Sequence, residues 1–167
     1  MESESGMRLR PLLCGLLAIM LVLPLLLGAC GSGGTTVADV DLAALEQRLR
    51  AELEFKDEMM ALDDSLFARF YDFDIALAAD HRITVSSGWT PEEIALFKAR
   101  DEAGATAIEK GLTARRERQI ERFTDYVPEE RPKAEGAVII RSGLHVAYVA
   151  CAKPEDARRI IKAVFGG

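Results

Sequence analysis

The chain has 167 residues, of which 49% are hydrophobic and 29% charged, and its formal net charge is −6. This length is enough for one domain with a real hydrophobic core. Nucleic-acid binding requires clustered positive charge, so the mildly acidic balance argues against a nucleic-acid partner.

The first feature along the chain is a leader typical of bacterial lipoproteins. Arg8 and Arg10 precede an apolar run from Leu12 to Leu27, and the run ends in the small-residue cleavage site Leu27-Gly28-Ala29-Cys30. We therefore predict a signal peptide over residues 1–29, removed by cleavage before Cys30. By resemblance to bacterial lipoproteins, Cys30 carries a diacylglycerol on its sulfur and a further acyl group, such as palmitate, on its amine.

This reading places the protein at the cell membrane, lipid-anchored on the extracytoplasmic side. Two or three acyl chains hold a protein durably in a bilayer. The alternative is an uncleaved signal anchor, because the apolar run approaches the roughly 20 residues of a membrane-spanning helix. Gly15, Pro24 and Gly28 would interrupt such a helix. The initiator is either Met1 or Met7.

Beyond the leader, we expect a lipidated cysteine and flexible tether over residues 30–38 and one globular domain over residues 39–167. The domain opens with helical patterns. Asp41 can cap a helix in which leucines recur at spacings of three and four, from Leu42 to Leu53. Such a helix could also lie on the membrane surface, but its acidic polar face would be repelled by anionic lipid.

A second, shorter helix is predicted to begin at Asp63 or Asp64 and to end near Tyr71–Asp74. Alternating residues then predict a strand over His81–Ser86, followed by a turn at Ser87-Gly88. Thr90-Pro91-Glu92-Glu93 carries helix-start signals, so we predict one helical turn there, leading into a strand from about Ile94 to Arg100.

The second half of the domain follows a similar order. A longer helix is predicted from Asp101 to the segment Tyr126-Val127-Pro128. Two apolar strands, Ala137–Arg141 and Leu144–Val149, are expected to form a hairpin around a two-residue turn at Ser142-Gly143. A last helix begins at Pro154 and is stopped by Gly166.

These elements predict an α+β fold in which N-terminal helices precede a ββαββα arrangement. Two hairpins, each followed by a helix, indicate a mainly antiparallel sheet with the helices packed on one face. The other face would then be the natural surface for a partner.

Four parts of the sequence together resemble a known family. They are the lipoprotein cleavage site, the stretch Glu93–Asp101, the linker Tyr126–Glu130 and the hairpin joined by Ser142-Gly143. The pattern is similar to the bacterial lipoprotein family catalogued as domain of unknown function 4358, over about Leu42 to Phe165. That family occurs mainly in Gram-positive bacteria of the Firmicutes type and has no assigned activity. The resemblance therefore implies a location and a fold, and leaves the function open.

Residues suited to catalysis or metal binding are few. The histidines His81 and His145 fall on predicted strands, where packing or surface roles are the usual ones, and Cys151 reads as a small buried hydrophobe. A structural zinc site usually needs four nitrogen or sulfur ligands. The acidic pairs Glu92-Glu93, Glu129-Glu130 and Asp63-Asp64 mostly stand where structure alone would place acids. We predict no catalytic residue, no metal site and no cofactor.

Binding is the more plausible class of function. Trp89, Tyr71 and Tyr126 adjoin predicted turns or helix ends and are the candidate contacts for a partner, with core packing as the alternative. We expect a non-catalytic binding or accessory module with a protein or peptide partner in the cell envelope. One alternative is a cell-envelope hydrolase with two carboxylates within about 10 Å in a concave site. Another is a small-ligand or peptide receptor with a sizeable apolar pocket near Trp89.

Overall fold

An antiparallel sheet of five strands lies at the centre of the structure, a computed structural model that describes residues 39–166. The strand order is β1-β2-β3-β5-β4. In chain order the helices and strands are α2 (Leu42–Glu52), β1 (Met60–Ala61), α3 (Phe67–Phe70), β2 (Ala78–Val85), β3 (Glu93–Ala99), α4 (Glu102–Asp125), α5 (Arg131–Glu135), β4 (Val138–Ser142), β5 (His145–Ala150) and α6 (Pro154–Phe165). The predicted α+β class and the antiparallel sheet are confirmed. The predicted signal peptide, Cys30 and the tether lie outside the described residues.

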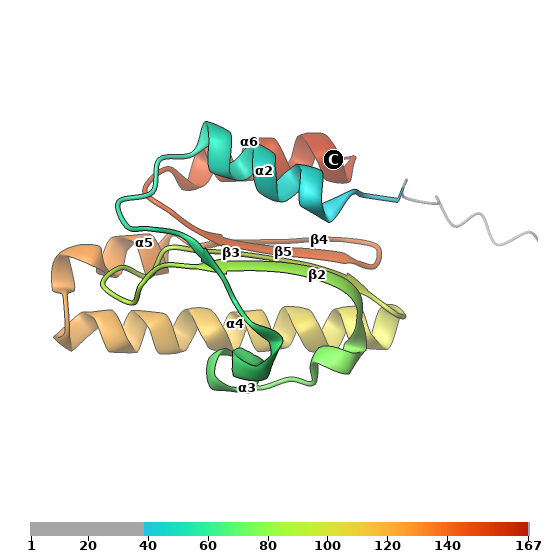
Figure 1. Cartoon of the computed structure of the whole chain (residues 1–167), viewed down its shortest axis with the longest axis horizontal. Coiled ribbons are helices and arrows are strands. Elements are labelled where there is room, and N and C mark those ends of the chain that lie inside the picture. Colours follow the sequence, from blue (N-terminus) through green and yellow to red (C-terminus); the bar gives the residue numbers. More distant parts are fainter. Residues whose placement is uncertain (1–38, 167) are drawn as a thin grey trace, which may run out of the picture. The chain divides into compact units, whose positions relative to one another are not determined.

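Helices cover both faces of the sheet, with α2 and α6 on one side and α3 and α4 on the other (Figure 1). Successive residues of β3 show why. Ile94 and Leu96 belong to the core shared with α2 and α6, whereas Ala95 and Phe97 belong to the core shared with α4. The prediction of helices on a single face is therefore wrong. Because β3 and β5 are apolar on both sides, each of their faces needs a cover.

The first core forms where α2 and α6 pack against the sheet and against each other. The Asp41 side chain caps α2 by accepting from two backbone amides, as predicted. Leu42, Leu45 and Leu49 are at most 2% exposed. The apolar stripe of α2 is thus used inside the domain, which contradicts the alternative that it lies on a membrane surface.

The second core joins α4 to a group of aromatic rings. The rings of Phe67, Tyr71, Phe73 and Phe97 contact one another at centroid distances of 4.8–6.4 Å. The ring of Phe73 lies directly against Gly111 of α4. This close approach explains a glycine in the middle of a long helix, where its backbone freedom is otherwise a cost.

The structure departs from the prediction in the segments between the main elements. Thr90 lies in a bend, Pro91 and Glu92 belong to no helix, and the predicted helical turn is absent. The Thr90 hydroxyl donates to the Glu92 carboxylate, 3.1 Å away. The hairpin turn lies one residue later than predicted, at Gly143-Leu144, since Ser142 pairs with His145. Gly143 has φ of 55°, which suits glycine.

Several short elements carry no strong sequence pattern and were not predicted. They are β1, α5 and the 3₁₀ helices over Ile75–Leu77 and Pro128–Glu130. The predicted short helix after Asp63 is present as the 3₁₀ helix Asp64–Leu66 followed directly by α3. The strand β2 also begins at Ala78, before the predicted His81. Short elements such as these depend on tertiary pairing more than on local periodicity.

Replacing Gly111 by alanine is expected to lower the free energy of unfolding by about 1–3 kcal/mol, because overpacking forces neighbouring side chains to move. A Cβ at this position would lie 2.1 Å from Phe73 Cδ1. Urea denaturation measures the change. Introducing Phe73→Ala first should remove the penalty of the second substitution; an unchanged penalty in that background would show that the ring is not its cause.

Candidate functional site

Trp89 stands at the tip of the loop between β2 and β3. The Ser86 hydroxyl closes this loop by donating to the carbonyl oxygen of Thr90 at 2.6 Å. Gly88 adopts φ of 106°, and its carbonyl oxygen accepts a hydrogen bond of 3.1 Å from the Arg122 guanidinium of α4. Held in this way, the loop leaves the Trp89 side chain 66% exposed.

Tyr126 meets Trp89 from the end of α4, where it is the C-terminal cap residue. The two rings stack with their centroids 5.9 Å apart and their planes 29° from parallel, and Tyr126 is 51% exposed. Beneath them, Phe123 is buried and meets Tyr126 edge-on. The structure therefore brings together two of the three aromatic residues proposed as partner contacts.

A pocket of about 430 Å³ is lined by this aromatic pair together with Lys56, Asp57, Thr90, Val127 and Glu129. We call it the Trp89–Tyr126 pocket. Its size falls within the usual range of ligand sites, about 300–1,000 Å³. The receptor alternative called for a sizeable apolar pocket near Trp89. A pocket lies there, but charged and polar residues share its lining with the rings.

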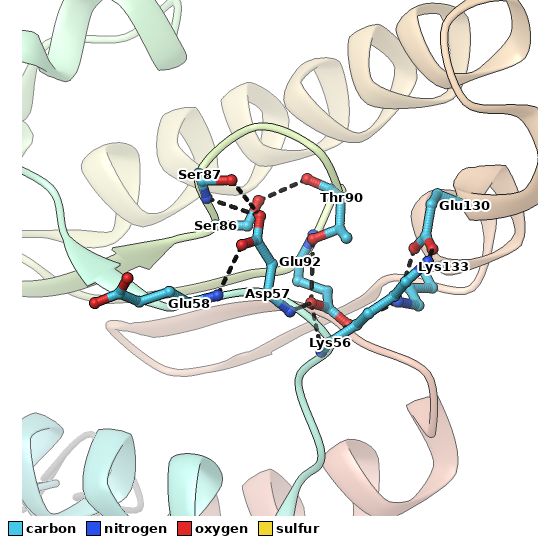
Figure 2. Close-up of polar contacts among 9 residues, drawn as sticks. All are labelled: Lys56, Asp57, Glu58, Ser86, Ser87, Thr90, Glu92, Glu130 and Lys133. Atoms are coloured by element: carbon cyan, nitrogen blue, oxygen red, sulfur yellow. Dashed lines mark hydrogen bonds and ion pairs between the residues drawn. The ribbon is translucent and has the colours of Figure 1, made fainter.

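Glu92 supports the pocket from within the fold. Its side chain is buried, and its carboxylate accepts hydrogen bonds from the backbone amides of Lys56 and Asp57 at 2.9–3.1 Å, from Thr90 Oγ1 and from Lys133 Nζ (Figure 2). The two amides belong to the segment between α2 and β1, so Glu92 fastens that segment to the start of β3. Removing this carboxylate would release one wall of the pocket.

Glu92 is one of four charged residues in a compact glutamate–lysine cluster, which comprises Glu92, Glu130, Lys56 and Lys133. Lys133 Nζ lies 2.7 Å from both Glu92 Oε1 and Glu130 Oε2, and Lys56 Nζ lies 2.5 Å from Glu130 Oε1 (Figure 2). Burial opposes ionisation of Glu130, but the hydrogen bonds from Lys133 and Lys56 outweigh it and lower the pKa of Glu130. The four charges sum to zero, which is how buried carboxylates are usually accommodated.

Glu93 follows Glu92 in the chain and is the first residue of β3; its side chain points to the opposite side of the sheet. Its carboxylate accepts from Arg115 Nη2 at 2.7 Å and Nε at 3.0 Å, and from the Tyr71 hydroxyl at 2.6 Å. Burial, followed by the Glu93 charge, raises the pKa of the Tyr71 hydroxyl well above its usual value. The adjacent acids Glu92 and Glu93 therefore serve two separate ion-pair systems.

Tyr71 is 2% exposed, so the prediction that it contacts a partner is wrong. Its ring packs in the aromatic core with Phe67, and its hydroxyl is used by Glu93. A tyrosine after a short helix turns inward here because the buried carboxylate requires a donor.

A family model described as domain of unknown function 4358 (DUF4358) matches residues 51–151 of this chain. The chain belongs to the DUF4358 family. No curated protein and no solved structure matches it. The matched segment of this DUF4358 protein includes all the residues that line the Trp89–Tyr126 pocket and all four members of the glutamate–lysine cluster.

The two histidines and the cysteine of the DUF4358 domain pack within the fold. His81 Nε2 lies 2.9 Å from Asp64 Oδ1, and its ring stacks on Phe97. His145 is buried beside Phe165, and burial lowers its pKa. Cys151 is also buried, which raises the pKa of its thiol.

Within residues 39–166 of the DUF4358 chain, no group of three or more histidine, cysteine or acidic side chains is arranged to hold a metal ion. In the same part of the chain, no helix has the length and apolar character needed to cross a membrane. Of the other acidic pairs, Asp63 caps the turn at Ser65, while Glu129 is exposed and Glu130 buried.

Lys56 and Lys133 are residues of the candidate site that the sequence did not reveal. A pair of acids at the start of an apolar strand is the signal that could have indicated them, because a buried carboxylate needs a cation. The sequence does not say which lysines of the DUF4358 domain supply it.

Proposed function

We propose that this protein is a lipid-anchored lipoprotein of the cell envelope whose extracytoplasmic domain is a non-catalytic binding or accessory module. The observation that carries the proposal is the stacked, exposed pair Trp89 and Tyr126 at the Trp89–Tyr126 pocket. Tryptophan and tyrosine are enriched among the residues that dominate binding energy at interfaces. Both rings remain more than half exposed beside the pocket, and a partner would bury this surface.

The anchor is the second element of the proposal. Lipid on Cys30 would hold the domain at the extracytoplasmic surface of a Gram-positive cell membrane, where a protein or peptide partner would meet the pocket. The support is the order of Arg8, Arg10, the apolar run and the small-residue site ending in Cys30.

The two buried carboxylates of the glutamate–lysine cluster favour peptide binding over hydrolysis. Glu92 and Glu130 are close together, since each lies 2.7 Å from Lys133 Nζ. A general acid needs a raised pKa, whereas the pKa of Glu130 is lowered by its lysine partners. Both carboxylates are buried and already form ion pairs with lysines, which suits a structural role.

Replacing Trp89 by alanine is expected to abolish capture of the partner in intact cells. Chemical crosslinking of the full-length protein, followed by mass spectrometry, identifies what the wild type captures and measures how much of it the variant retains. The expected loss follows from the removal of a central aromatic contact, a change that commonly weakens interfaces by 2 kcal/mol or more, about 30-fold.

The matched control is Met60→Ala, which removes another large exposed apolar side chain, 47% exposed, outside the pocket. This variant should capture the same proteins as the wild type. Undiminished capture by the Trp89→Ala variant would contradict the proposed binding site.

A further inference from the structure

The charged side chains that line the Trp89–Tyr126 pocket differ in the ion pairs and hydrogen bonds that they form within the domain. Lys56 pairs with Glu130 in the glutamate–lysine cluster. Asp57 accepts hydrogen bonds from the Ser87 hydroxyl and from the Ser87 and Glu58 amides, and the Ser87 hydroxyl is the main reason why its pKa is lowered (Figure 2).

Glu129 is the exception among these groups. It is exposed, it lines the pocket, and it forms no ion pair or side-chain hydrogen bond with any residue between 39 and 166. The pocket therefore presents one uncommitted negative charge together with two exposed aromatic rings, Trp89 and Tyr126.

We propose that the pocket binds a cationic side chain, lysine or arginine, carried by a peptide or protein partner. The inference rests on the proposed binding function and names the chemistry of its ligand. A cation over tryptophan gains attraction from the ring, most of all among the aromatic residues. Glu129 would pair with the same cation from the side of the pocket.

The overall charge supports this choice. Residues 1–38 contain two acidic and two basic residues, Glu2, Glu4, Arg8 and Arg10, which cancel, so the described domain carries the whole net charge of −6. A negative domain attracts cationic partners over distances longer than direct contact. The chain also provides its own example of the contact, because the Arg122 guanidinium lies 5.7 Å from the centre of the Tyr126 ring.

Other ligand classes fit the pocket less well. An anionic group would need an uncommitted cation in the lining, but the one cation among the described residues that lines the pocket, Lys56, is paired with Glu130. A purely apolar ligand would cover Glu129 without pairing it, and an unpaired buried charge is costly.

The experiment is a calorimetric titration of the full-length protein, in detergent micelles, with a trilysine peptide blocked at both ends. The same peptide with acetylated side-chain amines is the neutral probe, and a blocked triglutamate is the anionic one. We expect binding of trilysine, at least about tenfold weaker binding of the neutral peptide, and no binding of triglutamate. Glu129→Gln should weaken trilysine binding about threefold to fivefold, as for an exposed ion pair.

Glu117→Gln is the matched control, because Glu117 is also exposed and forms no ion pair within the described residues. It precedes Tyr126 in α4 by about 14 Å along the helix axis, beyond the range of unscreened charge effects. This variant should bind trilysine as the wild type does.

Tryptophan fluorescence shows whether trilysine binds at the pocket, since Trp89 is the single tryptophan of the chain. Its emission should change with trilysine in proportion to the calorimetric saturation. Equal binding of the neutral or anionic peptide, no binding of trilysine, an unresponsive Trp89 or an unaffected Glu129→Gln variant would each overturn the inference. The proposed function stands or falls separately, on the capture of cellular partners by the Trp89→Ala variant.

Discussion

Replacing Arg115 by methionine is expected to lower the free energy of unfolding by about 3–5 kcal/mol, because it leaves a buried charge without its partner. The Glu93 side chain is 1% exposed and the Arg115 side chain 10%. Without the guanidinium, Glu93 would retain, within the described residues, only the hydrogen bond from the Tyr71 hydroxyl. A loss of this size is a large part of the total stability of an ordinary domain, about 5–15 kcal/mol. Urea or thermal denaturation followed by circular dichroism measures it.

The control for this prediction lies one turn further along α4. Arg118 pairs with Asp72 at the surface, with 37% and 67% of the two side chains exposed. Arg118→Met should therefore cost at most about 1 kcal/mol. Adding Glu93→Gln to Arg115→Met should recover part of the loss, since the unpaired charge is then gone. Equal stabilities of the Arg115→Met and Arg118→Met variants would refute the importance of the buried pair.

Replacing Cys30 by alanine is expected to move the protein from the membrane fraction to the soluble fraction or the medium. The acyl chains would be lost with the thiol, and each buried methylene contributes about 0.8 kcal/mol to membrane binding. Fractionation by ultracentrifugation, together with intact-mass measurement of the wild type and the variant, tests both the anchor and the cleavage before Cys30. The domain itself should unfold at the same denaturant concentration.

Cys151→Ala is the matched control for the anchor. It removes a cysteine that is buried in the described domain and should leave the protein on the membrane. The uncleaved signal anchor is the correct interpretation if the Cys30→Ala variant stays on the membrane and if the masses of both the variant and the wild type include residues 1–29.

The main elements of the fold could be predicted because their patterns are local. The helices α2, α4 and α6 have capping residues and apolar positions at spacings of three and four, and the strands β4 and β5 are short apolar runs around a glycine turn. The predicted placement of all helices on one face of the sheet was wrong, although the sequence contained a sign of two covered faces. Every residue of β5 is buried, and a strand that is apolar on both sides indicates two covered faces.

The candidate site was only partly predictable. The exposure of Trp89 follows from its place in a tight loop, but its stacking on Tyr126 joins residues far apart in the sequence. The segment from Thr90 to Glu93 shows why such features escape local patterns. Its local sequence favours the start of a helix. Glu92 and Glu93 instead pair with Lys133 and Arg115 on opposite sides of the sheet, and these tertiary contacts outweigh the local preference.

If the chain is exported as proposed, the sharing of one core by α2 and α6 has a consequence for how it reaches its folded state. A chain that crosses a membrane with its N-terminal side first delivers α2 to the outside early, whereas α6 arrives only after the whole sheet. Until then the leucine stripe of α2 has no complete cover, and closing so long a loop is slow. We expect the domain to remain open throughout translocation and to fold in one late step, during which the emerging chain depends on protection from aggregation at the cell surface.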